Sequence, residues 1–157
     1  MGLSGWRCHL KVALLHQEGA LRTFVIVLAT GDEVMAALGS AAREHGLGAS
    51  QFTAIGAFER AVVAYFDWPS KQYTRIPIDE QVEVLTLTGD IAMDGGKPKI
   101  HAHVVLGTRT GTARGGHLVE GHVRPTLEVM LTELPRHLHR RFDRESGLAL
   151  IDPSAGA

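Results

Sequence analysis

The chain has 157 residues, 45% of them hydrophobic, and a formal net charge of −1. This length suits one domain with a sizeable core, and this composition excludes a disordered chain. A near-neutral chain lacks the overall positive field that sequence-independent nucleic-acid binding requires, although a local basic patch is still compatible with it.

The cellular compartment is indicated by the cysteine count and by the lack of a membrane or signal segment. The single cysteine, Cys8, cannot form an internal disulfide and favours a reducing compartment. No apolar run reaches the ~20 residues that cross a bilayer, and the apolar run at 11–15 is too short for the core of a signal peptide. We therefore expect a cytoplasmic protein with no membrane partner.

The first 50 residues predict a short strand, a buried strand and one helix. Residues 1–20 are weakly patterned, and we interpret them as an N-terminal extension with a short edge strand over 10–15. Residues 23–29 form a continuous β-branched and apolar run, which is typical of a strand buried on both faces. Thr30 to Glu33 matches a capping box, so a helix should begin there and end near Gly46.

The rest of the chain predicts only strands. Turn or breaker residues separate the apolar runs, chiefly Gly56, Pro69, the Asp94-Gly95-Gly96 hairpin turn and Pro125. The expected strands cover 51–55, 61–67, 72–77, 81–93, 99–107, a return from the turn at 109–111 to 123, 126–132 and 137–141. We predict an α+β fold over residues 21–151, with a curved, mostly antiparallel sheet or partial barrel packed against one early helix. Residues 152–157 should form a frayed tail.

Several of these strands carry apolar side chains on both faces. In one of them Leu85 and Leu87 alternate with Val82 and Val84. One short helix cannot cover both sides of such a sheet, and burying apolar surface stabilises by ~25 cal/mol per Å². We therefore expect a homo-oligomer; a monomeric barrel with a filled interior is the alternative.

Three histidines give the strongest chemical signal. His101 and His103 are two residues apart in a predicted strand, so they share a face with a spacing of roughly 6.5–7 Å. A three-residue loop over 109–111 would pair the flanking strands so that His117 lies opposite His103 on that face. The sequence thus predicts a three-histidine metal site; ordinary surface or hydrogen-bonded histidines are the alternative.

Gly115 and Gly116 precede the third histidine and bear on this prediction. A bulge at these glycines would shift the register. They would also let the backbone pass close to a bound ion or ligand. Three imidazole ligands suit zinc, nickel, copper or iron better than magnesium or calcium, and they leave one position open. Zinc is the first choice.

Six short motifs follow one another in the chain: TGDEV (30–34), FTAIGA (52–57), EVLTLTG (83–89), HAHVVLG (101–107), GGHL (115–118) and PTLEV (125–129). Together they resemble the PPC domain ("plants and prokaryotes conserved") in its stand-alone bacterial form. The resemblance implies an antiparallel α/β fold and a homotrimer whose strands pack across the subunit interfaces. It also implies metal at His101, His103 and His117.

Bacterial proteins that this chain resembles often carry a DNA-binding label, which rests here on family analogy alone. Plant relatives join the domain to AT-hooks, which enter the minor groove. This chain has no Arg-Gly-Arg-Pro segment. The basic stretch that comes closest to such a segment contains Arg136, Arg140 and Arg141, and Arg144 follows it. We interpret this stretch as a solvated strand edge, with a nucleic-acid patch as the alternative.

Three functions remain open at this point. The first is a small-ligand site or a metal-dependent enzyme. Glu83 is its candidate base; the alternative is that Glu83 is a structural carboxylate. The second is a DNA-associated regulator. The third is a structural metal trimer that serves as a scaffold for protein partners, in which metal removal would lower only stability.

Overall fold

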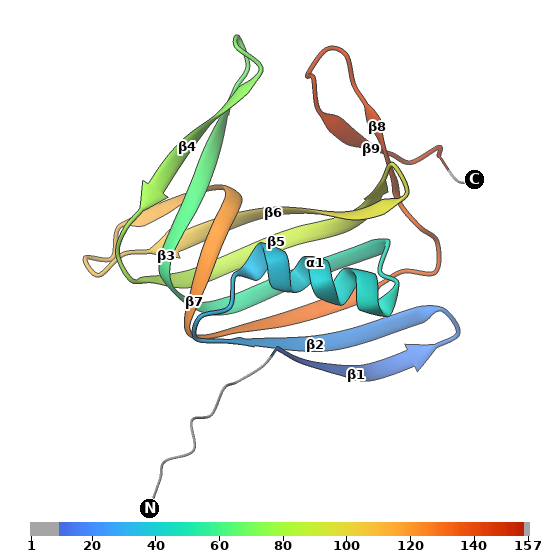
Figure 1. Ribbon diagram of the computed structural model, residues 1–157, viewed down its shortest axis with the longest axis horizontal. Helices are drawn as coiled ribbons and strands as arrows, with labels where there is room; N and C mark the ends of the chain where they lie inside the picture. Colours follow the sequence, from blue (N-terminus) through green and yellow to red (C-terminus); the bar gives the residue numbers. More distant parts are fainter. Residues whose placement is uncertain (1–9, 156–157) are drawn as a thin grey trace, which may run out of the picture.

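The computed structural model describes residues 10–155 and places them in nine strands and one helix (Figure 1). The elements before the long strands are β1 (Lys11–Glu18), β2 (Leu21–Ala29) and α1 (Val34–His45). The later ones are β3 (Ala49–Asp67), β4 (Gln72–Ile78), β5 (Val82–Asp94), β6 (Lys97–Gly107), β7 (Ala113–Glu133), β8 (His139–Phe142) and β9 (Ala149–Asp152). Residues 1–9, which include Cys8 and slightly less than half of the predicted N-terminal extension, and residues 156–157 lie outside the described part.

The strands form one curved sheet that is not closed into a barrel. Its order is β1-β2-β7-β3-β5-β8-β9, with β4 paired to β3, and β6 paired to both β5 and β7. All pairs are antiparallel except a single parallel contact between Met93 of β5 and His139 of β8. The helix α1 lies inside the curve (Figure 1). The predicted class, a mostly antiparallel curved sheet against one early helix, is confirmed.

The helix begins three residues later than the capping box predicted. Glu33, not Thr30, is the N-cap, and its carboxylate accepts hydrogen bonds from two backbone N–H groups of the first turn. The same carboxylate accepts from the backbone of Gly121 in β7, so this cap also fixes the helix to the sheet. The Thr30 hydroxyl does not cap the helix; it donates a hydrogen bond to the carbonyl oxygen of Pro125. Gly46 ends the helix in the left-handed conformation, as predicted.

Two predicted strand breaks lie inside continuous strands. Gly56 is within β3 and Pro125 is within β7, and each marks an irregularity where these two strands pair. A Cβ on Gly56 would collide with the carbonyl oxygen of Thr126, so only glycine permits this approach. Glycine and proline interrupt regular strands, but they are tolerated at bulges, where the ladder is already disturbed.

The core fills the space between α1 and the inner face of the sheet. The helix buries Val34, Leu38, Ala41 and Ala42 there. The largest apolar side chains buried on the sheet include Ile26, Leu28, Phe58, Leu87, Leu106 and Leu127. No helix within residues 10–155 is long and apolar enough to cross a membrane.

The outer face of the sheet carries apolar side chains with no cover within the described chain. Ile55 of β3, Leu85 of β5, Val105 of β6 and Met130 of β7 come from neighbouring strands and are 38–61% exposed. We call these four residues the outer apolar face. The expectation that strands would be apolar on both faces is therefore confirmed.

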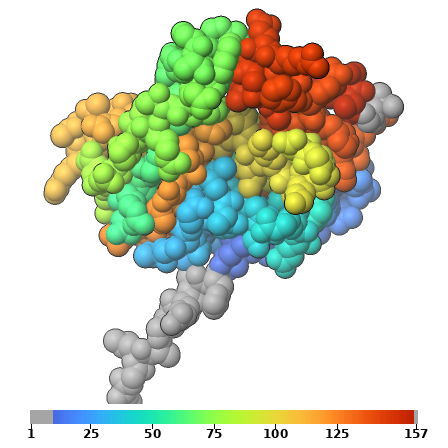
Figure 2. All heavy atoms as spheres, turned by 45° about the horizontal axis from the view of Figure 1, so that its top comes forward, coloured from blue at the N-terminus to red at the C-terminus, as the bar shows by residue number. Residues whose placement is uncertain are grey.

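The C-terminal segment forms a hairpin, β8–β9, where the sequence predicted one strand. It joins the sheet through the single Met93–His139 pair. The tip of the β3–β4 hairpin lies beside it, and the space-filling view shows the two hairpins in contact (Figure 2). These hairpins rise on the same side of the sheet as the outward-facing histidines described next.

Candidate metal centre

The predicted hairpin register is confirmed, and it brings His103 opposite His117. The pairs run from His103–His117 to Gly107–Ala113 without a bulge in this ladder. The backbone of Thr108 donates to the carbonyl of Thr112, and Gly111 has a φ of 80°. The loop is therefore the three-residue type that the sequence indicated.

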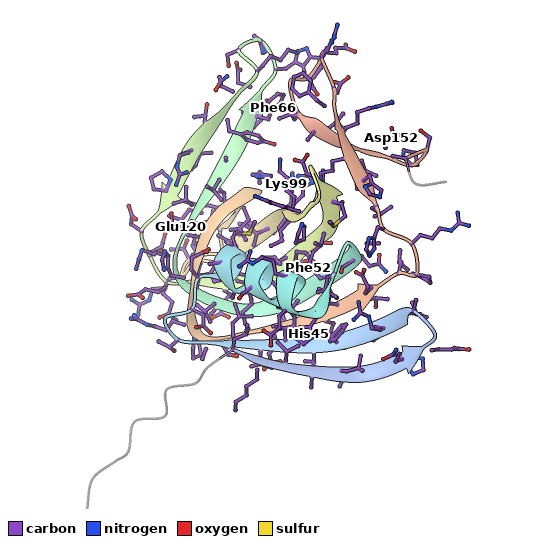
Figure 3. The ribbon with its side chains drawn as sticks, turned by 45° about the vertical axis from the view of Figure 1, so that its right-hand side comes forward. His45, Phe52, Phe66, Lys99, Glu120 and Asp152 are labelled. Carbon is purple, nitrogen blue, oxygen red and sulfur yellow. The ribbon has the colours of Figure 1, made fainter. Side chains whose placement is uncertain are left out.

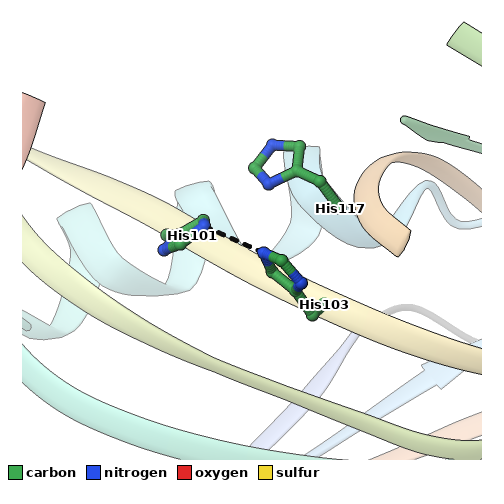
Figure 4. A group of neighbouring side chains, drawn as sticks. All are labelled: His101, His103 and His117. Carbon is green, nitrogen blue, oxygen red and sulfur yellow. Dashed lines mark hydrogen bonds between the residues drawn. The ribbon is translucent and has the colours of Figure 1, made fainter. Parts of the chain in front are cut away.

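The three imidazole rings converge on one point. One ligand atom from each of His101, His103 and His117 can be chosen so that all lie within 4.8 Å of one another. The Nε2 atoms of His101 and His103 are 3.2 Å apart. Figure 4 shows the three rings around a shared space, with one ring nitrogen of His117 on the side of the other two.

This arrangement fits a transition-metal ion. Metal–nitrogen bonds of about 2.0–2.1 Å place ligand atoms on a tetrahedral ion ~3.3 Å apart, close to the observed separation of the two Nε2 atoms. The Nδ1 atom of His117 is buried and has no hydrogen-bond partner among the described residues. A buried nitrogen without a partner is costly, and a metal bond would satisfy it.

The surroundings of His117 and His103 keep these two rings in the neutral form, which is the form that binds a metal. Burial lowers the pKa of His117 to about 4, and the neighbouring His101 and His103 act in the same direction. Burial, together with His101, also lowers the pKa of His103. Near pH 7 these imidazoles are therefore neutral and their lone pairs are free to coordinate.

A carboxylate and a guanidinium lie behind His101. The Nδ1 atom of His101 is 3.6 Å from Asp90, which lies opposite it on β5, and Asp90 also pairs with Arg140 of β8. Burial raises the pKa of Asp90, but His101 and Arg140 together outweigh it, so the net shift is downward. An ionised carboxylate at this place can orient the ring so that Nε2 faces the ion.

Sequence reasoning missed Asp90 and Arg140, although one signal was available for Asp90. The Asp94-Gly95-Gly96 turn was predicted, and counting back from it along both strands places Asp90 opposite His101. Arg140 has no comparable signal, because it reaches the site through the isolated contact of β8 with β5.

A cavity of about 190 Å³ lies beside the histidines, between the two hairpins. Figure 3 shows the β3–β4 hairpin, with Phe66, and the β8–β9 hairpin, with Asp152, on two sides of the space near Lys99. The ring of Tyr73 packs on the ring of His117 with centroids 4.7 Å apart. The other lining residues are Lys99, Ile100, His101, Arg140 and Leu148 to Leu150.

Gly115 and Gly116 lie next to His117, and the structure gives them a packing role. A Cβ on Gly115 would be 2.6 Å from the carbonyl oxygen of Val104, and one on Gly116 would be 2.7 Å from that of Ala64. These glycines therefore allow the backbone of β7 to pass close to its neighbouring strands. Their proposed approach to a ligand stays a prediction.

Glu83 lies away from the histidines within one chain. It pairs with Gly107, four residues beyond His103 on β6, which corresponds to about 13 Å along the strand. It is exposed and lines a different cavity with Gln81, Thr108 and Arg109. The single chain therefore gives Glu83 no role at the metal centre.

The basic stretch, interpreted above as a solvated strand edge with a nucleic-acid patch as the alternative, is divided by the fold. Arg136, Arg141 and Arg144 are exposed, and Arg141 pairs with Asp152. Arg140 is only 6% exposed and is held by Asp90, so its inclusion in a surface patch was wrong. A guanidinium that is buried and already paired cannot neutralise a DNA phosphate.

The fold and this site define a β-rich, single-helix protein with a candidate three-histidine metal centre. The model of the Plants and Prokaryotes Conserved (PCC) domain matches residues 15–135, which is most of the chain. The chain belongs to this family, the one that the six sequence motifs resemble. No curated protein matches it.

Solved structures agree with this assignment. A plant- and prokaryote-conserved protein of Pyrococcus horikoshii is 29% identical with a TM-score of 0.78, and the match covers 90% of this chain and 94% of that one. A metal-containing protein of Archaeoglobus fulgidus is 30% identical with a TM-score of 0.78, covering 92% and 98%. A candidate DNA-binding protein of Ralstonia eutropha is 32% identical with a TM-score of 0.78, covering 82% and 90%.

Proposed function

We propose that this protein is a homotrimer that binds a divalent transition metal, zinc first among them, at His101, His103 and His117. The metal would hold a small ligand or a partner group at its open position. The observation that carries this proposal is the convergence of three ring nitrogens, one of them buried without any other partner among the described residues. The metal-containing relative from Archaeoglobus, 30% identical, supports it.

The homotrimer is supported by the outer apolar face. Four large apolar side chains on adjacent strands are left in water by the single chain. Contiguous apolar surface of this kind marks interfaces in soluble proteins. A cytoplasmic location, expected from the single cysteine, belongs to the same proposal.

The test is elemental analysis of the purified protein and of a His101→Ala/His103→Ala variant. We expect about one equivalent of transition metal per chain in the wild type and almost none in the variant. A His137→Ala/His139→Ala variant is the matched control, because it removes a second His-x-His pair and should keep the metal. Equal metal content in the wild type and the His101→Ala/His103→Ala variant would contradict the proposal.

A second candidate function is DNA binding, favoured by the candidate DNA-binding relative from Ralstonia. Here the exposed Arg136, Arg141 and Arg144, repeated around a trimer, would contact phosphates. Fluorescence anisotropy with duplex DNA should then show affinity that falls steeply with salt. Absence of binding at ~50 mM salt would exclude this function.

A metal-dependent enzyme is the alternative use of the same centre. An open position on the ion can polarise a carbonyl group or activate a water molecule. The cavity lined by His101 and His117 would give a small molecule access to that position. Glu83 is too far along the strand to act as its base within one chain.

A further inference from the structure

The cavity beside the metal centre has walls of different chemistry. His101 and His117 form one side, and Tyr73 of β4 forms a second. Leu148 and Leu150 of the C-terminal hairpin form a third. Any molecule in this space lies between the two hairpins and against two of the three imidazoles.

The charges of the site favour an anion. Three neutral imidazoles leave both positive charges of a divalent ion uncompensated. Asp90, the nearest carboxylate described at the site, is already paired with Arg140. The lining residues within 10–155 include no carboxylate, and their cations, Lys99 and Arg140, are already paired with Asp94 and Asp90. The open position on the ion should therefore attract a negatively charged donor.

The walls favour a flat, apolar body. The Tyr73 ring packs at 32° on His117 and at 58° against Phe66, with centroids 4.7 Å and 5.1 Å away, so this wall of the cavity is aromatic. A dry cavity of roughly 150 Å³ in another protein accepts benzene. The 190 Å³ available here suits one aromatic ring with a small substituent.

Two buried polar atoms of the lining residues have no hydrogen-bond partner within the described chain. One is Nδ1 of His117, which the metal would satisfy, and the other is Nε of Arg140. Arg140 also donates to the carbonyl of Ala149 in the wall strand β9, so it holds that wall beside the histidines.

We infer that this cavity binds a monocyclic aromatic carboxylate, with the carboxylate on the metal and the ring between Tyr73 and the pair Leu148 and Leu150. The inference rests on the proposed metal function. The ion supplies the attraction for the carboxylate, while Tyr73, Leu148 and Leu150 select the body of the ligand.

Benzoate is the probe, titrated calorimetrically into the zinc-loaded protein. Benzyl alcohol keeps the ring without the charge, and acetate keeps the carboxylate without the ring. We expect benzoate to bind at least ten-fold more tightly than either, and to lose at least ten-fold in affinity when the metal is removed. Equal affinity for the three compounds would overturn the inference.

Cobalt substitution gives a readout that is independent of affinity. A carboxylate that enters the coordination sphere changes the visible absorption of Co²⁺, so benzoate should shift that spectrum and benzyl alcohol should not. An unchanged spectrum on benzoate addition would overturn the inference while leaving the metal site intact. Failure of the protein to take up metal at all would instead contradict the proposed function, so the two failures are distinguishable.

A variant tests the position of the ligand. Leu148→Trp should fill the cavity, retain metal as judged by elemental analysis, and weaken benzoate binding at least ten-fold. Leu134→Trp, at an exposed position outside the lining residues, is the matched control and should bind benzoate like the wild type. Unchanged benzoate affinity in a metal-loaded Leu148→Trp protein would show that benzoate binds elsewhere.

Discussion

At the scale of single residues, the carboxylate behind His101 is placed to hold one of the proposed metal ligands in position. Asp90 contacts His101 and Arg140 but is not one of the three clustered ligands. Such carboxylates fix the orientation of a ligating ring, and their loss typically costs roughly 10–100-fold in metal affinity.

We therefore expect Asp90→Asn to bind zinc roughly 10–100-fold more weakly while remaining folded. Competition with a chromophoric chelator measures the affinity. Asp94→Asn is the control, because Asp94 is on the same strand but pairs only with the exposed Lys99 among the described residues. Wild-type affinity in Asp90→Asn would show that the carboxylate does not orient the ring.

His117 makes the stability of the metal-free protein depend on pH. Its pKa is lowered from 6.5 to about 4 in the folded state. Between these values the unfolded chain binds a proton that the folded chain does not, so the unfolding free energy falls as the pH falls. The loss should begin near pH 6.5 and be complete near pH 4.

Urea denaturation of the metal-free protein across this range measures the effect. His117→Gln should show a smaller fall between pH 6.5 and pH 4, since the titrating ring is gone. Several aspartates with lowered pKa values, such as Asp67 and Asp143, also weaken the fold in acid, so the comparison of the two proteins isolates His117.

At the scale of elements, one buried carboxylate joins the end of β7 to the start of β3. Glu133 is 2% exposed and accepts hydrogen bonds from the backbone of Gly48 and Ala49 and from the hydroxyl of Ser50. Nothing in the sequence singles it out, because its donors are more than 80 residues away.

We expect Glu133→Ala to lower the unfolding free energy by about 3 kcal/mol, because it leaves several buried donors without a partner. Denaturant titration measures the change. Glu18→Ala, at an exposed position on β1, should change stability by less than ~0.5 kcal/mol. A comparable loss in both variants would argue against a special role for Glu133.

The close crossing of β3 and β7 at Gly56 gives a second prediction at this scale. Gly56→Ala should cost about 3 kcal/mol or more, because its Cβ would overlap the carbonyl oxygen of Thr126. Gly19→Ala changes a glycine that also has a positive φ but no atom within 4 Å, and should cost only about 1 kcal/mol. Thermal denaturation separates the two; equal losses would mean that the backbone conformation alone matters.

Local patterns predicted the parts of the molecule that depend on near neighbours in the chain. The two-residue period and the loop at Gly111 were enough to place His103 opposite His117. Contacts between distant segments were not predictable in this way. Gly56 and Pro125 were interpreted as breaks because each disturbs an isolated strand, and only their meeting in space shows why both strands continue. Arg140 was placed on the surface because nothing local indicates that β8 turns back toward Asp90.

At the scale of the whole molecule, the outer apolar face sets the expected state of assembly. A trimer of 17.0 kDa chains has a mass of about 51 kDa. Ile55→Lys places a charge on that face, and burying an unpaired charge is strongly unfavourable.

Light scattering should therefore give about 51 kDa for the wild type and about 17 kDa for Ile55→Lys. Lys97→Glu, at an exposed position beside the turn between β5 and β6, changes charge away from this face and should remain a trimer. A wild type of single-chain mass, or a trimeric Ile55→Lys protein, would contradict this assignment of the interface.

The family match ends at residue 135, before the hairpin that closes the cavity. The three histidines lie within the matched region, whereas Arg140, Leu148 and Leu150 lie beyond it. The proposed metal ligands and Tyr73 thus lie in the matched region, whereas the opposite wall of the proposed ligand site lies in the C-terminal hairpin. Exchanging the segment after residue 135 would therefore change one wall of the proposed ligand site, and it would also remove Arg140, the partner of the carboxylate behind His101.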